Sequence, residues 1–268
     1  MPILKTDAIV INKRDFRETS LLADFYTRDH GKISGLLKGI RKEPRKFAST
    51  IEPFSHNEIV FYKSRTSSLH LVSQCDMKDN FSTIRQDLNK TAAGSVIMEL
   101  LDAVMPHEDK NEEIFDLTVS VLKEMSGPVP AEKLLIIFKI KMLALSGFKP
   151  NFDSCVCCDS RISMGEIRFS LSLGGLLCSR CPRKDPKSRA IFRGTVASIQ
   201  YIQKNSLQNT LGLGLNPQIK KELCFILDSF VTFHLGKKIK SQAVMEQLRM
   251  KTPGNGQGNE ARIGIGSR

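Results

Sequence analysis

Residues 7–42 read DAIVINKRDFRETSLLADFYTRDHGKISGLLKGIRK, and this stretch decides the fold of the N-terminal part. Short apolar runs at 8–11, 20–26 and 33–37 alternate with turn signals such as His30-Gly31-Lys32. Runs of this length between turn residues are typical of β-strands. Two further runs, at 51–61 and 68–73, bring the number of predicted strands to five. Five short strands suit a small closed barrel, so we predict an OB-fold over residues 1–80.

From residue 81 onward, apolar residues recur at steps of three and four, which predicts helices. We expect helices at about 81–105, 112–125 and 131–145, and two more near 193–204 and 217–236. The predicted class is therefore α+β, with an N-terminal five-stranded OB-fold barrel followed by a central and C-terminal α-helical domain. The helical domain comprises residues 81–150 and 183–250, interrupted by a cysteine-bearing insert at 151–182. The tail at 251–268 is rich in Gly and Asn and is predicted to be disordered.

The insert carries the strongest local motif of the sequence. Cys155-Val156-Cys157-Cys158 is followed, after nineteen residues, by Cys178-Ser179-Arg180-Cys181. Two residues between thiolates let one turn present both sulfurs to a metal, and two such turns complete a tetrahedron at about 2.3 Å per Zn–S bond. We therefore predict one structural zinc in a zinc ribbon, with Cys155, Cys158, Cys178 and Cys181 as its ligands. Cys157 is a spare sulfur that can compete as a ligand, and a redox-active dithiol is the alternative use of the pairs.

Positive charge is concentrated at the two ends of the chain. The formal net charge is +12, and residues 1–80 and 151–268 are basic while residues 81–150 are slightly acidic. The densest basic segment reads KISGLLKGIRKEPRK, from Lys32 to Lys46. On an OB barrel this loop would lie beside the face that tracks a nucleic-acid backbone. The predicted DNA contacts are Lys32, Lys38, Arg41, Lys42, Arg45 and Lys46, and the alternative is an ordinary solvated loop.

Other residues extend this hypothesis. Four aromatic residues offer either a base-stacking surface or barrel core: Phe47, Phe54, Phe61 and Tyr62. A second basic cluster lies at the last zinc knuckle and beyond it: Arg180, Arg183, Lys184, Lys187, Arg189 and Arg193. A third is Lys237-Lys238-Ile239-Lys240, which also suits capping charge at a helix C-terminus. Either cluster would extend a phosphate path or receive an acidic peptide tail.

The sequence favours a protein without catalytic activity. Its five His residues stand alone, no GxxxxGK[ST] or HExxH motif is present, and no GxGxxG follows a strand. No apolar stretch reaches the roughly 18 residues that cross a bilayer, and the N-terminus does not read as a secretory signal. We therefore expect a cytoplasmic protein with no membrane association and with reduced cysteines, which favours metal over disulfides.

Several of these segments resemble one family. The opening segment DAIVINKRDFRETSLLADFYTRDHGKISGLLKGIRK, then IEPF, LSGFKPNFDSCVCC and FSLSLGGLLCSRC are similar to the RecO family of bacterial DNA repair and recombination mediators. The resemblance covers about residues 1–240 and implies an OB-fold, a helical bundle and an inserted zinc ribbon. It also implies binding of single- and double-stranded DNA, annealing of complementary strands, and help to the recombinase in replacing single-strand-binding protein.

The resemblance further implies two protein partners and a place in the cell. The partners are RecR and the acidic C-terminal tail of single-strand-binding protein, and the place is the cytoplasm, in association with the nucleoid. By position, the resemblance carries the zinc ligands over to the four cysteines and the DNA-contacting loop to Lys38, Arg41, Lys42, Arg45 and Lys46. Two other readings stay open: an RNA-binding or translation-associated OB/zinc-ribbon protein, and a scaffold in which zinc and charge serve protein contacts only.

Overall fold

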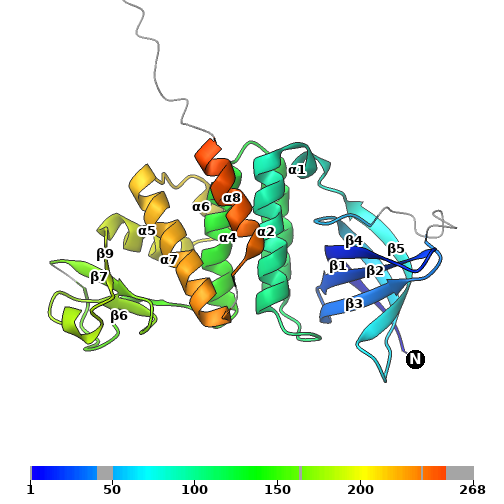
Figure 1. Ribbon diagram of the computed structural model, residues 1–268, viewed down its shortest axis with the longest axis horizontal. Helices are drawn as coiled ribbons and strands as arrows, with labels where there is room; N and C mark the ends of the chain where they lie inside the picture. Colours follow the sequence, from blue (N-terminus) through cyan, green and yellow to red (C-terminus); the bar gives the residue numbers. More distant parts are fainter. Residues whose placement is uncertain (1, 41–50, 163–164, 237, 252–268) are drawn as a thin grey trace, which may run out of the picture.

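The structure is a computed structural model that describes residues 2–40, 51–162, 165–236 and 238–251. The barrel lies at one end of an elongated molecule, helices occupy the middle, and a small sheet lies at the other end (Figure 1). The predicted α+β arrangement of barrel, helices and inserted cysteine ribbon is confirmed. None of the helices within the described ranges is both long and apolar enough to cross a membrane.

The barrel has the OB topology. Its strands are β1 (Ile3–Phe16), β2 (Ser20–Thr27), β3 (Gly31–Leu37), β4 (His56–Tyr62) and β5 (Leu69–Asp79). They close in the order β1-β2-β3-β5-β4, with β3 and β5 parallel and the other pairs antiparallel. Alternate side chains point inward, as the period of a strand requires. The barrel core includes Val10, Phe25, Ile33, Ile59 and Phe61.

The helices are α1 (Ser82–Gln86), α2 (Leu88–Val104), α3 (Glu112–Ser126), α4 (Ala131–Leu145), α5 (Arg193–Lys204), α6 (Leu207–Leu211), α7 (Pro217–Leu235) and α8 (Lys240–Lys251). The predicted helices are present, but the one expected over 81–105 is divided at Asp87, which is extended and caps α2, and α6 and α8 are additional. The N-terminus of α8 is capped by Glu99 of α2, whose carboxylate accepts from the backbone N–H of Lys240 at 2.7 Å and of Ser241 at 2.9 Å. A carboxylate there satisfies free N–H groups and favours the helix dipole.

The small sheet is built from β6 (Asn151–Cys155), β7 (Ile167–Ser170), β8 (Gly175–Leu177) and β9 (Arg189–Ile191), in the order β6-β8-β7-β9. β7 and β8 form a hairpin, and its turn residue Gly174 has φ +67°, which favours glycine. β9 is a fourth strand from a segment that we expected to belong to the helical domain. A 3-10 turn, η2 (Pro182–Lys184), connects the second cysteine pair to it.

Barrel and helices share one core. Ile9, Ile11 and Tyr26 point out of the barrel and join the buried cluster formed by the helices. The ring of Tyr26 lies 6.3 Å from that of Phe115 on α3. The turn at Gly31 fits so closely that a Cβ there would lie 2.3 Å from the carbonyl oxygen of Asp109. The barrel is therefore held in one orientation on the helices.

Candidate nucleic-acid interface and metal centre

The four predicted zinc ligands meet in space. Strands β6 and β8 run parallel, with Cys155 opposite Leu176, so both cysteine pairs lie at the same end of the small sheet. Each pair closes a tight turn: the Asp159 N–H donates to the Cys155 carbonyl at 2.8 Å, and the Cys181 N–H donates to the Cys178 carbonyl at 3.0 Å. The sulfurs of Cys155, Cys158, Cys178 and Cys181 all lie within 4.8 Å of one another. The sequence alone thus located the cluster.

The donor set fits a tetrahedral metal. Zn–S bonds of about 2.3 Å place two sulfurs of a tetrahedron about 3.8 Å apart, and the sulfurs of Cys158 and Cys178 lie 3.7 Å apart. The Cys178 N–H also donates to the Cys155 sulfur at 3.5 Å, a contact that favours a thiolate. Cys157 is exposed and lies outside the cluster, so the four-sulfur set excludes the spare cysteine. The four cysteines together can hold one metal ion.

A basic end of the barrel is formed by the β1–β2 hairpin and the end of β3. Arg14, Arg17 and Lys38 are exposed there, together with the acidic residues Asp15 and Glu18. The strand register pairs Phe16 with Ser20 and Leu21 with Leu37, which brings Lys38 beside the hairpin tip. Arg17 is in the left-handed region with φ 54°, which the tight hairpin turn imposes. Arg14 and Arg17 were not among the predicted contacts, which were drawn from the dense basic segment between Lys32 and Lys46.

Arg41, Lys42, Arg45 and Lys46 lie outside the described residues, but the flanks of their segment are well defined. Ile40 packs against the barrel core and Ile51 is buried in it. The Lys13 ammonium bonds Glu52 at 2.8 Å, and the Phe54 N–H donates to the Val10 carbonyl at 3.0 Å. Both ends of the segment that holds these four basic residues are thus fixed on the barrel.

Lys32 is not part of this basic end. Its side chain is 8% exposed, and its ammonium donates to the backbone carbonyl of Asp102 at 2.5 Å and to the carboxylate at 3.0 Å. The residue points out of the barrel, as its position in β3 requires, but α2 covers that face. The prediction that Lys32 contacts DNA is contradicted by this burial, and Lys32 instead ties the barrel to the helical domain.

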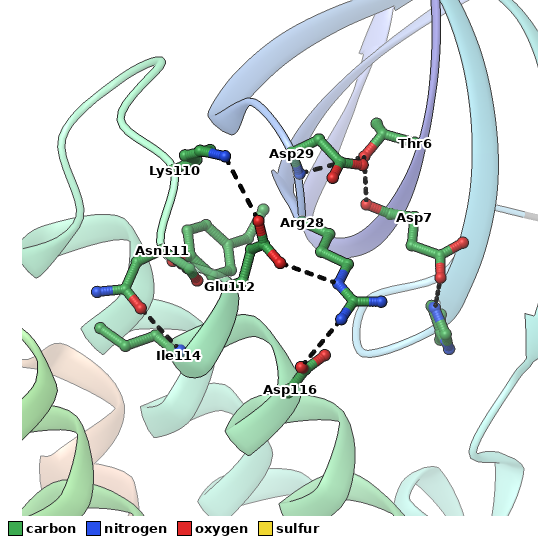
Figure 2. Close-up of polar contacts among 11 residues, drawn as sticks. Thr6, Asp7, Arg28, Asp29, Lys110, Asn111, Glu112, Ile114 and Asp116 are labelled. Carbon is green, nitrogen blue, oxygen red and sulfur yellow. Dashed lines mark hydrogen bonds and ion pairs between the residues drawn. The ribbon is translucent and has the colours of Figure 1, made fainter.

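A second set of polar contacts fixes the barrel to α3 (Figure 2). The Arg28 guanidinium lies between two carboxylates of α3, at 3.2 Å from Asp116 and 3.9 Å from Glu112. Asn111 caps the same helix by accepting from the Ile114 N–H at 3.0 Å, and its carbonyl accepts from the Tyr26 hydroxyl at 3.2 Å. Arg28 therefore bridges the barrel and α3 at the edge of their contact, where its side chain stays 43% exposed.

The four aromatic residues that we predicted as stacking candidates form no stacking platform among the described residues. Phe61 is fully buried in the barrel core, and Phe54 packs between β1 and Gly94 of α2. Tyr62 is half-buried, and Phe47 lies outside the described residues. The outer faces of β2, β3 and β5 instead carry the aliphatic residues Leu22, Leu36 and Leu71, which lie opposite one another across the strands. The aromatic residue at the hairpin tip is half-buried Phe16, and the Arg17 guanidinium carbon lies 5.3 Å from the centre of its ring.

Two buried histidines of the barrel make its stability depend on pH. Burial lowers the pKa of His56 and of His70, although Asp7 and Glu108 beside them act in the opposite direction. Below the ordinary histidine pKa of about 6.5, the unfolded chain binds more protons than the folded one, so stability falls as pH falls. We expect the free energy of unfolding to be greatest above pH 6.5 and to decrease toward pH 5. Denaturant titrations at several pH values measure this free energy. In His56→Gln the free energy of unfolding should change less steeply with pH, and an unchanged dependence on pH would show that His56 does not contribute to it.

The fold and the site define the class: an OB-fold protein with a helical domain and a cluster of four cysteines that can hold a metal ion. The family model described as "Recombination protein O N terminal" matches residues 1–81, and the one described as "Recombination protein O C terminal" matches residues 85–243. The chain belongs to the recombination protein O family.

Several curated relatives share the name "DNA repair protein RecO". The "DNA repair protein RecO" of Desulforamulus reducens is 29% identical over 96% of this chain and 99% of its own length. That of Desulfatibacillum aliphaticivorans is 30% identical over 94% of this chain and 99% of its own, and that of Bacillus pumilus is 28% identical over 92% and 94%. The similarity therefore spans barrel, helices and ribbon together.

Proposed function

We propose that this protein acts in DNA repair as a non-catalytic, DNA-binding mediator of recombination. It would anneal complementary strands and help the recombinase replace single-strand-binding protein on single-stranded DNA. The observation that carries the proposal is the basic end of an OB barrel, in a chain whose relatives are DNA repair proteins. Arg14, Arg17 and Lys38 stand there in solvent, beside the ends of the segment that holds Arg41, Lys42, Arg45 and Lys46.

The mechanism is electrostatic. Lysine and arginine neutralise phosphates and release counterions, which gives affinity with little base specificity. Two complementary strands repel each other, and a basic surface that holds one strand lowers the repulsion that the second must overcome. No covalent step is needed for this action, so the protein would act without catalytic groups.

The remaining components follow the same hypothesis. Zinc is the metal that four thiolates favour, and its coordination would be complete, which suits a structural role and not a hydrolytic one. The partners implied by the family resemblance are RecR and the acidic tail of single-strand-binding protein. The groove between α7 and α8 is a candidate site for the tail, because it places Lys238 beside the apolar residues Phe233 and Ile239. The protein would work in the cytoplasm, on the nucleoid.

The test is annealing of labelled complementary oligonucleotides coated with single-strand-binding protein. We expect the combined change Arg41→Glu, Lys42→Glu and Arg45→Glu to abolish annealing. We also expect the log–log salt dependence of single-strand binding to fall by about 2, since each phosphate contact contributes about 0.7. An RNA pair of the same sequence, run in parallel, distinguishes the RNA-binding alternative.

A matched control reverses three exposed lysines elsewhere: Lys123, Lys149 and Lys204. This variant changes the net charge by the same amount and should anneal like the parent protein. Equal losses in both variants would mean that total charge, and not the barrel end, governs binding. Absence of annealing by the folded parent protein would refute the proposal.

A further inference from the structure

Two phenylalanine rings stand in solvent at the end of the molecule opposite the barrel. Phe192, the N-cap residue of α5, is 45% exposed, and Phe225 on α7 is 44% exposed. Glu222 links them, because its carboxylate accepts from the Phe192 N–H at 2.9 Å and lies one turn before Phe225 on the same face of α7. The two rings therefore flank Glu222 along α7, that of Phe192 on the side of Ile219 and that of Phe225 one turn beyond Glu222. We call this surface the distal surface and define it by Lys187, Arg189, Phe192, Lys221 and Phe225.

Both rings are held in position. The guanidinium carbon of Arg189 lies 4.2 Å from the centre of the Phe225 ring, in cation–π geometry. The ring of Phe192 folds over Gly194, where a Cβ would lie 2.5 Å from its Cε1 atom. Arg189 belongs to β9, which is itself paired with β7 of the metal-binding sheet. The rings are thus presented by rigid elements and not by a loop.

The distal surface carries more positive than negative charge, because one of its acidic residues is buried and the other is held in hydrogen bonds. The segment from residue 182 to residue 193 contains five basic residues and one acidic residue, Asp185. Asp185 is buried and accepts from the hydroxyls of Ser170 at 2.5 Å and Ser172 at 3.0 Å. Glu222 is occupied by the Phe192 N–H and by the hydroxyl of Thr195 at 2.6 Å. Lys187, Arg189 and Lys221 remain exposed.

We propose that the distal surface is a second binding site for single-stranded DNA, on which bases stack against Phe192 and Phe225. A single strand exposes base faces and phosphates. Exposed rings can stack on the bases, and the arginine and lysine residues between them can bind the phosphates. The site deepens the proposed function, on which it rests. It lies across the helical domain from the barrel (Figure 1), so one molecule can hold two separate strands. The barrel end supplies charge, and the distal surface supplies stacking.

The absence of tryptophan from the chain makes a local test possible. The variant Phe192→Trp introduces a single fluorophore at the site, which should be quenched when the folded protein is titrated with oligo(dT) at low salt. Tyr201→Trp is the matched control, since Tyr201 is an exposed residue on α5, nine positions after Phe192 and therefore on the opposite face of the helix, outside the distal surface. The control should show no comparable quenching. Adding Phe225→Ala to Phe192→Trp should lower the affinity for oligo(dT) about tenfold, which corresponds to the loss of one stacked base.

The outcomes separate this inference from the proposed function. The Arg41→Glu, Lys42→Glu and Arg45→Glu changes, made in the Phe192→Trp protein, should leave the quenching in place while annealing is lost. If oligo(dT) does not quench the Phe192→Trp fluorescence in a protein that still anneals strands, the distal site is refuted. The proposed annealing by the basic end of the barrel is then unaffected. A response to an acidic peptide but not to oligo(dT) would also overturn it, by assigning the surface to a protein partner.

Discussion

Replacement of Cys178 by Ser should remove the metal from the protein and unfold the small sheet. The sulfur of Cys178 lies 3.7 Å from that of Cys158, within a set of four that all lie within 4.8 Å. Binding of a structural zinc contributes about 10–16 kcal/mol in isolated zinc-finger peptides, which exceeds the whole stability of many domains. With three ligands left, we expect zinc content to fall from one equivalent to nearly none.

The loss should spread to the helical domain. Phe152 of β6 and Phe169 of β7 stack at 5.6 Å, and both belong to the same buried cluster as the helices. The Phe152 carbonyl also accepts from the Gln200 side chain of α5 at 2.6 Å. An unfolded sheet would expose this face of α5, so we expect the thermal unfolding temperature of the whole protein to fall together with its metal content.

Cys157→Ser is the internal control for this prediction. Cys157 is two residues from Cys155, yet it is exposed and outside the sulfur cluster. The Cys157 variant should keep one equivalent of zinc and the parent unfolding temperature. Metal analysis and calorimetry of the two variants measure both quantities. Full zinc retention in Cys178→Ser, or loss of zinc in Cys157→Ser, would mean that the ligand set is wrong.

The features that sequence reasoning located are those encoded within a short stretch of chain. Alternation within β1 and β2 is visible because each strand reads as a short apolar run beside a turn, and the cysteine spacing is visible because a knuckle needs only four residues. β9 escaped prediction because three residues carry too little pattern. The register of β9 against β7 nevertheless decides where Arg189 points.

The residues that were misplaced depend on partners distant in the chain. Lys32 stands in a basic segment, and only the packing of α2 on β3 brings Asp102, seventy residues away, to its ammonium. α8 begins beside Glu99, which lies 141 positions before the first residue that it caps. Charge in a sequence therefore gives the number of cations available, while the fold decides which of them face a ligand.

A buried charge network joins three helices, and its disruption should be costly. The Lys139 ammonium on α4 donates to the Asp228 carboxylate on α7. The Lys139 side chain is only 6% exposed, so it is shielded from solvent. It also donates to the Gln242 amide oxygen on α8 at 2.8 Å, and the Gln242 amide in turn donates to Asp228 at 2.8 Å. Each member of the network thus depends on the other two.

We expect Asp228→Ala to destabilise the protein by about 3 kcal/mol, because it leaves a buried ammonium without its counter-ion. This is the low end of the usual range, since Asp228 is 22% exposed and borders the groove between α7 and α8. Lys139→Met should cost less, because it adds an apolar chain to the core, and Asp228 keeps the Gln242 amide and contact with solvent. Denaturant unfolding of both variants measures the difference.

Asp153→Ala, in the exposed pair with Lys149 at 3.5 Å, is the matched control and should change stability by under about 0.5 kcal/mol. Equal costs for Asp228→Ala and Asp153→Ala would show that the Lys139 network is solvated and does not hold α8 in place.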